Sequence, residues 1–320
     1  MCQLAPWGLI FGGAATAGFM PAPLRLSLSG AGFLGSYHLG VGRALHRSGR
    51  LGQPATEVAG ASAGAIVGAV LVSETPMEAA RAALQALVAH TLAAPLGVLT
   101  PGFSLVDAVR GELTARLPGD AHRLASGRLH IALTSLRQGE LGRIHYKSAF
   151  GSRDELIDAV SASSDIPGFT GRLRAPMRSG YPVAGGHTLW QWLVGRHDVD
   201  GGLFDLFPDP WRGQQPATAF VSPFAGVGFA IAPHRTPGSL LVPTWSPLQS
   251  TGPGTGRTVE LSARNAGRWR DSFFPPSDAA VLRYEDEGFE AATAWLGAKA
   301  RSSKSDARDS GTTTRVRSDA

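Results

Sequence analysis

The run Gly60-Ala61-Ser62-Ala63-Gly64 contains the residue types that nucleophilic catalysis by a serine requires. The short stretch at 56–59 before it predicts a buried strand, and the apolar stretch at 65–72 after it predicts a helix. Small residues on both sides of Ser62 allow a tight strand-to-helix turn that exposes the serine hydroxyl. In a chain with 41 glycines, the pattern also fits an ordinary turn of small residues. The neighbouring motifs are therefore needed to distinguish a catalytic serine from an ordinary turn.

A glycine-rich loop precedes the serine motif. Residues 24–29 predict a strand, the sequence Gly-x-Gly-x-x-Gly occupies 30–35, and residues 37–45 predict a helix. A dinucleotide site of this form needs an acidic residue about twenty residues further on to hold the ribose. Here the interval is basic, and the first acid, Glu57, leads into the serine motif. The glycines fit a second task better, because backbone N–H groups at a helix start can stabilise an oxyanion.

The sequence Val199-Asp200-Gly201-Gly202 supplies a carboxylate downstream. Asp-Gly is a common turn dipeptide, and by itself it predicts a surface turn. Beside a nucleophilic serine, however, a buried carboxylate can act as the base once desolvation has raised its pKa. Asp198 is the rival carboxylate, because it lies two residues earlier and on the same face of a strand.

These three motifs, in this order, resemble the patatin-like phospholipase domain. The Gly-Phe-Leu-Gly-Ser-Tyr-His-Leu-Gly run at 32–40 is most similar to the adiponutrin and adipose triglyceride lipase branch of that family. Further similarities lie at 125–129, 152–157, 221–224 and 273–276, and the resemblance covers about residues 24–296.

The resemblance implies an α/β fold, a three-layer α/β/α sandwich with a mostly parallel central sheet. The alternation of predicted strands and helices favours the same architecture. The resemblance also implies a catalytic Ser–Asp dyad without histidine, in which Ser62 is the nucleophile and Asp200 the proton acceptor. The other implied site residues are Gly30, Gly32, Phe33 and Gly35 in the oxyanion hole, Gly60 and Gly64 in the nucleophile turn, and Gly201 and Gly202 beside Asp200.

By the same resemblance, the protein would cleave carboxylic esters of acylglycerols through an acyl-enzyme, in lipid catabolism and triglyceride homeostasis. Triacylglycerol is the first expected substrate, ahead of phospholipid and retinyl ester, and no metal or cofactor is needed. The expected location is cytoplasmic, at the surface of a lipid droplet or membrane. The resemblance does not specify a protein coactivator.

The chain departs from the family pattern before Asp200. Residues 176–197 form an insertion that contains Trp190 and Trp192. This segment is interpreted either as a loop at the mouth of the site, where the two tryptophans would contact lipid, or as an error of gene prediction. The asparagine that usually follows Asp-Gly-Gly is also missing.

Two other functions remain open. One is a conventional esterase with a Ser62–Asp200–His234 triad, although only about thirty residues separate the first strand from the serine motif. The other is a catalytically weak adaptor that binds lipid droplets or membranes. His38, shortly after the glycine-rich loop, is interpreted as a structural residue.

Composition sets further limits. The 320 residues are 43% apolar, enough for one large core, and the single cysteine, Cys2, excludes an intrachain disulfide. The net charge of +5 is uneven, with six Lys or Arg against three Asp after Gly297, and the excess of arginine over lysine is interpreted as genome base composition and not as nucleic-acid binding. Residues 1–23 are apolar but rich in Gly and Pro, which favours an extra or loosely membrane-associated segment over a membrane span. Residues 297–320 are predicted to be a disordered polar tail.

Overall fold

A central six-stranded sheet organises the protein in the computed structural model, which describes residues 23–51, 55–135, 142–166, 169–170, 198–203, 205–243 and 257–312. Strand β1 (Leu24–Leu28) lies between β2 (Thr56–Gly60) and β6 (Ala219–Val221) and runs parallel to both. Next to β2 comes β3 (Leu129–Ser135), again parallel. β4 (Arg143–Lys147) and β5 (Asp198–Asp200) both pair with β3 in the antiparallel sense. The prediction of a mostly parallel central sheet is confirmed.

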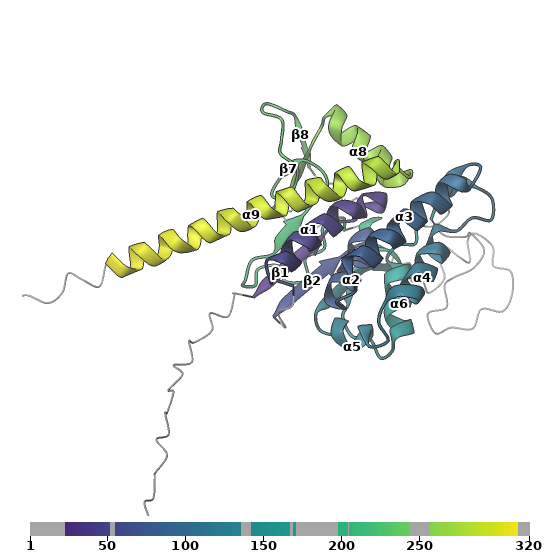
Figure 1. Cartoon of the computed structure of the whole chain (residues 1–320), viewed down its shortest axis with the longest axis horizontal. Helices are drawn as coiled ribbons and strands as arrows, with labels where there is room; N and C mark the ends of the chain where they lie inside the picture. Colours follow the sequence, from purple (N-terminus) through teal and green to yellow (C-terminus); the bar gives the residue numbers. More distant parts are fainter. Residues whose placement is uncertain are drawn as a thin grey trace, which may run out of the picture.

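Helices flank this sheet (Figure 1). The bounds of the α-helices are α1 Gly35–Arg47, α2 Ala63–Val72, α3 Met77–Ala93, α4 Leu105–Arg116, α5 Ala121–Ala125, α6 Arg153–Ala162, α8 Ala263–Phe273 and α9 Asp278–Thr312. In the described part of the chain, three short 3-10 turns are η1 Gly32–Leu34, η2 Gly97–Leu99 and η3 Gly201–Leu203. A second, small sheet has the strand order β7 (Gly226–Val227), β9 (Thr258–Glu260) and β8 (Leu241–Pro243).

Serine side chains cap three helices at the positions that sequence favours. The Oγ atoms of Ser104, Ser152 and Ser262 accept hydrogen bonds from backbone N–H groups three residues later. No side chain of a described residue caps α3: this helix begins at Met77 after Pro76, and the nearby Thr75 hydroxyl hydrogen-bonds to Ser73 at 2.9 Å.

The core is continuous from the sheet into the helices. Leu26, Leu28 and Val58 on the central strands are fully buried, as are Leu34 and Ile131. β1 and β2 each bury four of their five residues, so both faces of the sheet are covered there, and the partly buried Arg25 and Glu57 pair with each other at 2.6 Å. The loops that follow these buried strands are therefore held on a rigid base.

α9 packs closely along α1, as Figure 1 shows. A Cβ atom added to Gly40 of α1 would lie 1.8 Å from the Glu285 carbonyl oxygen, and one added to Gly288 of α9 would lie 2.1 Å from that of Tyr37. The buried Glu285 carboxylate accepts hydrogen bonds from Arg43 and Arg81, which fixes the register of the two helices.

α9 continues as a helix to Thr312, and this differs from the disordered tail predicted from residue 297. Alanine, lysine and arginine in this stretch favour helix, and no proline interrupts it. Residues 313–320, the 1–22 part of the N-terminal segment and the insertion at 176–197 lie outside the described residues. Among the helices that the structure describes, none has the length and apolar character needed to cross a bilayer.

Candidate active site

Ser62 occupies the turn between β2 and α2, where the parallel strands end at their carboxyl edge. Its backbone has φ 53° and ψ −124°, a region that a residue with a side chain rarely adopts. The surroundings hold it there: the Ser62 N–H donates to Ser163 Oγ at 3.0 Å, and the Ser163 hydroxyl donates to the Ala132 carbonyl at 2.7 Å. Such a conformation costs about 1–3 kcal/mol and is typical of functional sites.

The glycines on either side of this turn are required by close backbone contacts. A Cβ atom on Gly60 would lie 2.4 Å from the Gly64 carbonyl oxygen, and one on Gly64 would lie 2.3 Å from the Leu28 carbonyl oxygen. Backbone cannot retreat as a flexible side chain can, so this turn accepts only glycine at both positions. The structure thus gives a physical reason for the Gly-x-Ser-x-Gly spacing.

Asp200 ends β5 and is 2% exposed. Its Oδ1 atom accepts a hydrogen bond of 2.6 Å from the Gly202 N–H. The Asp200 backbone is fixed on both sides, because its N–H donates to the Asp165 carbonyl and its own carbonyl accepts from the Thr134 hydroxyl, each at 3.0 Å. The carboxylate is therefore oriented by its own strand, its own turn and the neighbouring strand.

Ser62 and Asp200 line the same cavity, which has a volume of about 360 Å³. A Cβ atom on Gly30 would lie 3.8 Å from the Ser62 Cβ and 3.7 Å from the Gly202 Cα, so the three motifs converge at one point. Beyond them the cavity is mainly apolar and extends between α2, α3 and α4. Its lining there includes Ile66, Val70, Ala83, Leu84, Leu87, Val109 and Leu113.

The glycine-rich loop also lines this cavity, but its N–H groups differ in availability. Gly30 donates its N–H to the Leu206 carbonyl at 3.0 Å, and Gly35 donates to the Gly32 carbonyl. Within the described residues, the N–H groups of Gly32 and Phe33 have no hydrogen-bond acceptor, as is usual in the first turn of a helix. Of the four predicted oxyanion residues, Gly32 and Phe33 thus have available donors, whereas Gly30 and Gly35 shape the loop.

Gly32 itself has φ +53°, and a Cβ atom there would lie 1.9 Å from the Ser272 carbonyl oxygen. The end of α8 therefore packs directly onto the backbone of the glycine-rich loop. This contact joins a part of the chain far from the three motifs to the site.

A hydrogen-bonded pair that the sequence analysis did not identify, the partly buried Tyr146 and the buried Asp205, holds the loop after Asp200. The Tyr146 hydroxyl donates to Asp205 Oδ2 at 2.7 Å, and the Asp205 N–H donates to the Gly201 carbonyl at 2.9 Å. Burial raises the pKa of Asp205, and the hydrogen bond from Tyr146 opposes this rise. Tyr146 lies on β4, fifty-nine positions away in the chain, so no local sequence signal connects the two residues.

Asp198, the rival carboxylate, does not line the cavity of Ser62. It pairs with Ser135 in the sheet, and its Oδ2 atom lies 3.5 Å from His145 Nε2. The structure thus brings Asp200, and not Asp198, to the serine.

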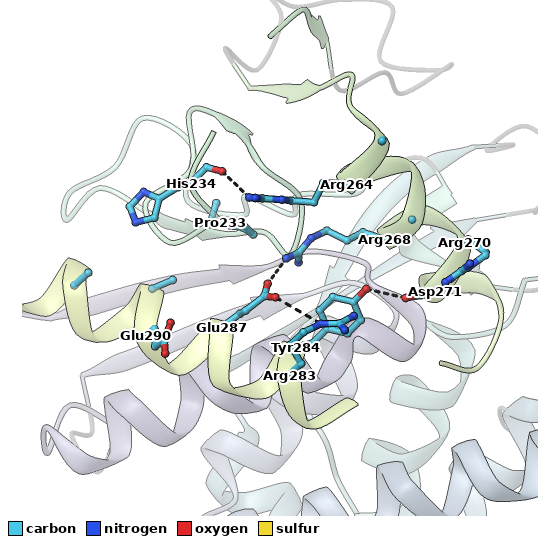
Figure 2. Close-up of a pocket in the computed structure, with 15 residues that line it drawn as sticks. Pro233, His234, Arg264, Arg268, Arg270, Asp271, Arg283, Tyr284, Glu287 and Glu290 are labelled. Carbon is cyan, nitrogen blue, oxygen red and sulfur yellow. Dashed lines mark hydrogen bonds and ion pairs between the residues drawn. The ribbon is translucent and has the colours of Figure 1, made fainter. Parts of the chain in front are cut away.

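His234 lies in a different cavity, of about 830 Å³, between the loop around Pro233, α8 and α9 (Figure 2). Arg264 donates to the His234 carbonyl there, Arg268 pairs with Glu287, and the imidazole ring points away from these groups. This position does not support a triad with Ser62.

His38 is completely buried, and its Nε2 atom lies 3.0 Å from the Ser29 carbonyl oxygen. Burial lowers the pKa of His38 to about 4, so the ring is neutral near pH 7. It supports the strand end that precedes Gly30, which agrees with the structural role predicted for it.

Asp165, whose carbonyl accepts the Asp200 N–H, carries a second perturbed carboxyl. Burial, together with the nearby charge of Asp107, raises the pKa of Asp165 to about 6. Asp165 is neither a predicted site residue nor a residue of the cavity lining, yet its flanking residues Ser164 and Ile166 are part of that lining.

The fold is that of an α/β protein built around a strand–serine–helix turn. More particularly, the chain belongs to the patatin-like phospholipase family, whose model matches residues 26–208. The predicted resemblance is confirmed.

Three relatives illustrate the range of the family. Patatin-like phospholipase domain-containing protein 2 of Rattus norvegicus is 32% identical over 83% of this chain and 49% of its own length. Patatin-like phospholipase domain-containing protein 4 of Homo sapiens is 30% identical over 83% of this chain and 94% of its own length. The Homo sapiens protein named 1-acylglycerol-3-phosphate O-acyltransferase PNPLA3 is 34% identical over 63% of this chain and 37% of its own length.

This chain therefore spans about half the length of the first of these relatives. Among solved structures, VipD from Legionella pneumophila matches with a TM-score of 0.49 and 14% identity, over 87% of this chain and 67% of that one.

Proposed function

We propose that this protein is a lipid acyl hydrolase that cleaves carboxylic esters of acylglycerols. The observation that carries the proposal is the convergence of Ser62, Asp200 and the open N–H groups of Gly32 and Phe33 on one mainly apolar cavity. A nucleophile, a base and oxyanion donors around one point are the parts that acyl transfer requires.

In the first step, Ser62 Oγ attacks the ester carbonyl carbon while Asp200 accepts the hydroxyl proton. The carbonyl oxygen becomes an oxyanion at the N–H groups of Gly32 and Phe33, and each such donor contributes roughly 3–4 kcal/mol to the transition state. Collapse of the tetrahedral intermediate breaks the bond between carbon and the alkoxy oxygen. Asp200 then returns its proton to the leaving alcohol, and the acyl group remains on Ser62.

In the second step, water attacks the acyl carbon and gives its proton to Asp200. The same two N–H groups stabilise the second oxyanion. Collapse releases the fatty acid and restores the Ser62 hydroxyl, which takes back the proton from Asp200.

The cavity favours an acyl chain as the group that is bound. Its apolar walls between α2, α3 and α4 provide burial for methylene groups, each worth about 0.8 kcal/mol. We rank triacylglycerol first and phospholipid second, and we place the reaction in lipid catabolism and triglyceride homeostasis. The proposed location is cytoplasmic, at the surface of a lipid droplet or membrane.

A second candidate is acyl transfer to an alcohol other than water. It is favoured by the relative whose name is 1-acylglycerol-3-phosphate O-acyltransferase. Both reactions pass through the same acyl-Ser62 intermediate and differ only in the group that attacks it. Product analysis separates them, because hydrolysis yields free fatty acid whereas transfer yields a new ester of an added lysophosphatidic acid acceptor.

The test of the proposed function is hydrolysis of emulsified triacylglycerol and of a soluble short-chain ester by four proteins. These are the wild type and the variants Ser62→Ala, Asp200→Asn and Asp198→Asn. We expect the first two substitutions to abolish turnover, and Asp198→Asn to retain most of it, because Asp198 lies outside the cavity. An inactive but well-folded wild type would favour the lipid-binding adaptor, and activity in Ser62→Ala would overturn the mechanism.

A further inference from the structure

The segment after α3, the end of α8 and the start of α9 lie on one side of the molecule (Figure 1), and each carries large exposed apolar side chains. We call this surface the apolar rim and define it by Leu96, Leu99, Trp269, Phe273, Phe274 and Leu282. Their exposed fractions run from 37% for Trp269 to 65% for Leu96. Large apolar side chains that are exposed close together mark an interaction surface more often than isolated ones do.

The rim is continuous with the cavity of Ser62. Trp269 and Phe273 line that cavity and are also exposed, so they connect its interior with the outer surface. Phe169, another lining residue, packs edge-on against Phe273 and Phe274, with ring centroids 5.8 and 6.3 Å apart. The α8 part of the rim therefore borders the entrance.

A small buried cluster joins the remaining parts of the rim to the same entrance. Val98 of η2 and Val281 of α9 pack together with Phe33 of the glycine-rich loop, and Phe169 packs against this cluster. Leu99 and Leu282 follow directly after Val98 and Val281 in the chain, and they are 55% and 42% exposed. The apolar rim therefore borders the entrance of the Ser62 cavity on two sides, at the end of α8 and at η2 with the start of α9.

The charges beside the rim do not favour one sign. Arg270 follows Trp269, but its guanidinium pairs with Asp271 at 2.7 Å. Asp278, in the first turn of α9, adds an exposed negative charge four residues before Leu282. Binding through this surface would therefore depend on apolar contact and not on attraction to an anionic surface.

We propose that the apolar rim docks the protein on a zwitterionic phospholipid surface, with the entrance of the Ser62 cavity facing the lipid. The inference rests on the proposed function, since a lipid ester leaves such a surface most directly through an entrance that is itself in contact with it. Phe274 and Leu282 insert among the acyl chains, while Trp269 and Phe273 form the passage into the cavity.

The test is flotation of the full chain with phosphatidylcholine vesicles, using the double variant Phe274→Ser/Leu282→Ser. Neither residue lines the cavity. The matched control is Leu240→Ser/Leu261→Ser, a second pair of exposed leucines, 65% and 62% accessible, beside the small sheet. We expect the rim variant to lose at least tenfold in partitioning and the control to float like the wild type, at both low and high salt.

The proposal is overturned if both variants lose vesicle binding equally, or if the rim variant loses none. It is also overturned by binding that requires anionic lipid and disappears in salt. Self-association that the rim variant abolishes, measured by light scattering, would assign the surface to a second copy of the chain and overturn it as well.

Flotation does not depend on turnover, so the proposal can fail separately from the proposed function. The Ser62→Ala protein should float like the wild type. If the wild type is active, the rim variant should keep its rate on the soluble ester and lose rate on the emulsion.

Discussion

The Gly30 N–H donates a 3.0 Å hydrogen bond to the Leu206 carbonyl, and this bond joins the oxyanion loop to the loop that follows Asp200. Because Asp205 precedes Leu206 and is held by Tyr146, one anchored loop sets the position of both the proposed base and the proposed oxyanion donors. The two halves of the site are therefore mechanically connected.

Tyr146→Phe should weaken this connection. The substitution leaves Asp205 buried without its hydroxyl donor, which costs roughly 1–3 kcal/mol of unfolding free energy. We also expect a lower kcat with a nearly unchanged KM, because the acyl cavity is untouched. Denaturant unfolding and steady-state kinetics measure both effects. The control is Tyr284→Phe, which removes a similar buried hydrogen bond between a hydroxyl and the Asp271 carboxylate. Neither Tyr284 nor Asp271 lines the Ser62 cavity.

Gly60→Ala and Gly111→Ala should change stability in opposite directions. The Cβ atom at Gly60 meets backbone at 2.4 Å, so we expect a loss of more than about 3 kcal/mol or failure to fold, as for other severe backbone clashes. At Gly111, in the middle of α4, a Cβ atom meets nothing within 4 Å, and alanine should stabilise the helix by about 1 kcal/mol. Thermal unfolding of the two variants provides the measurement, and a stable Gly60→Ala protein would contradict the turn geometry.

Ala83→Trp should shorten the acyl chains that the protein accepts. Ala83 lines the cavity on α3, whereas its neighbour Ala82 is exposed and does not. The indole would fill space between α3 and α4, so rates on long-chain esters should fall at least tenfold while rates on short-chain esters change little. Ala82→Trp should show the wild-type profile. A uniform decrease across all chain lengths would argue against an acyl channel there.

Asp165→Asn should stabilise the protein more at neutral than at acidic pH. The pKa of Asp165 rises from 3.8 to about 6 in the folded protein. Between these values the folded protein keeps a proton that the unfolded chain releases, so the wild type loses stability as the pH rises, by up to about 3 kcal/mol. Asparagine removes this loss. The measurement is the unfolding free energy of the wild type and of Asp165→Asn at pH 4 and pH 7.5. An equal difference between the two proteins at both pH values would contradict the raised pKa.

The parts of the site that could be predicted from the sequence are those with local physical causes. The turn at Ser62 needs small residues within two positions on either side, and the Asp200 turn needs the glycines that follow it. Their order along the chain identified the family.

The parts of the site that could not be predicted from the sequence depend on contacts between distant segments of the chain. The pairing of Tyr146 with Asp205 exists only because β4 and β5 both flank β3, and β5 is too short to reveal its antiparallel direction. Likewise, Gly30 and Gly32 look equivalent in sequence. Only the Leu206 carbonyl makes one N–H unavailable and leaves the other open.

The close packing of α9 on α1 limits where this chain can be truncated for expression. The family match ends at residue 208, yet β6, the α8 contact with Gly32 and the α9 contact with Gly40 all lie beyond it. A fragment that stopped at 208 would expose the outer edge of β1 and one whole face of α1. The smallest unit worth expressing therefore reaches through the first turns of α9, past Gly288, and a fusion partner belongs after the point where that helix leaves α1.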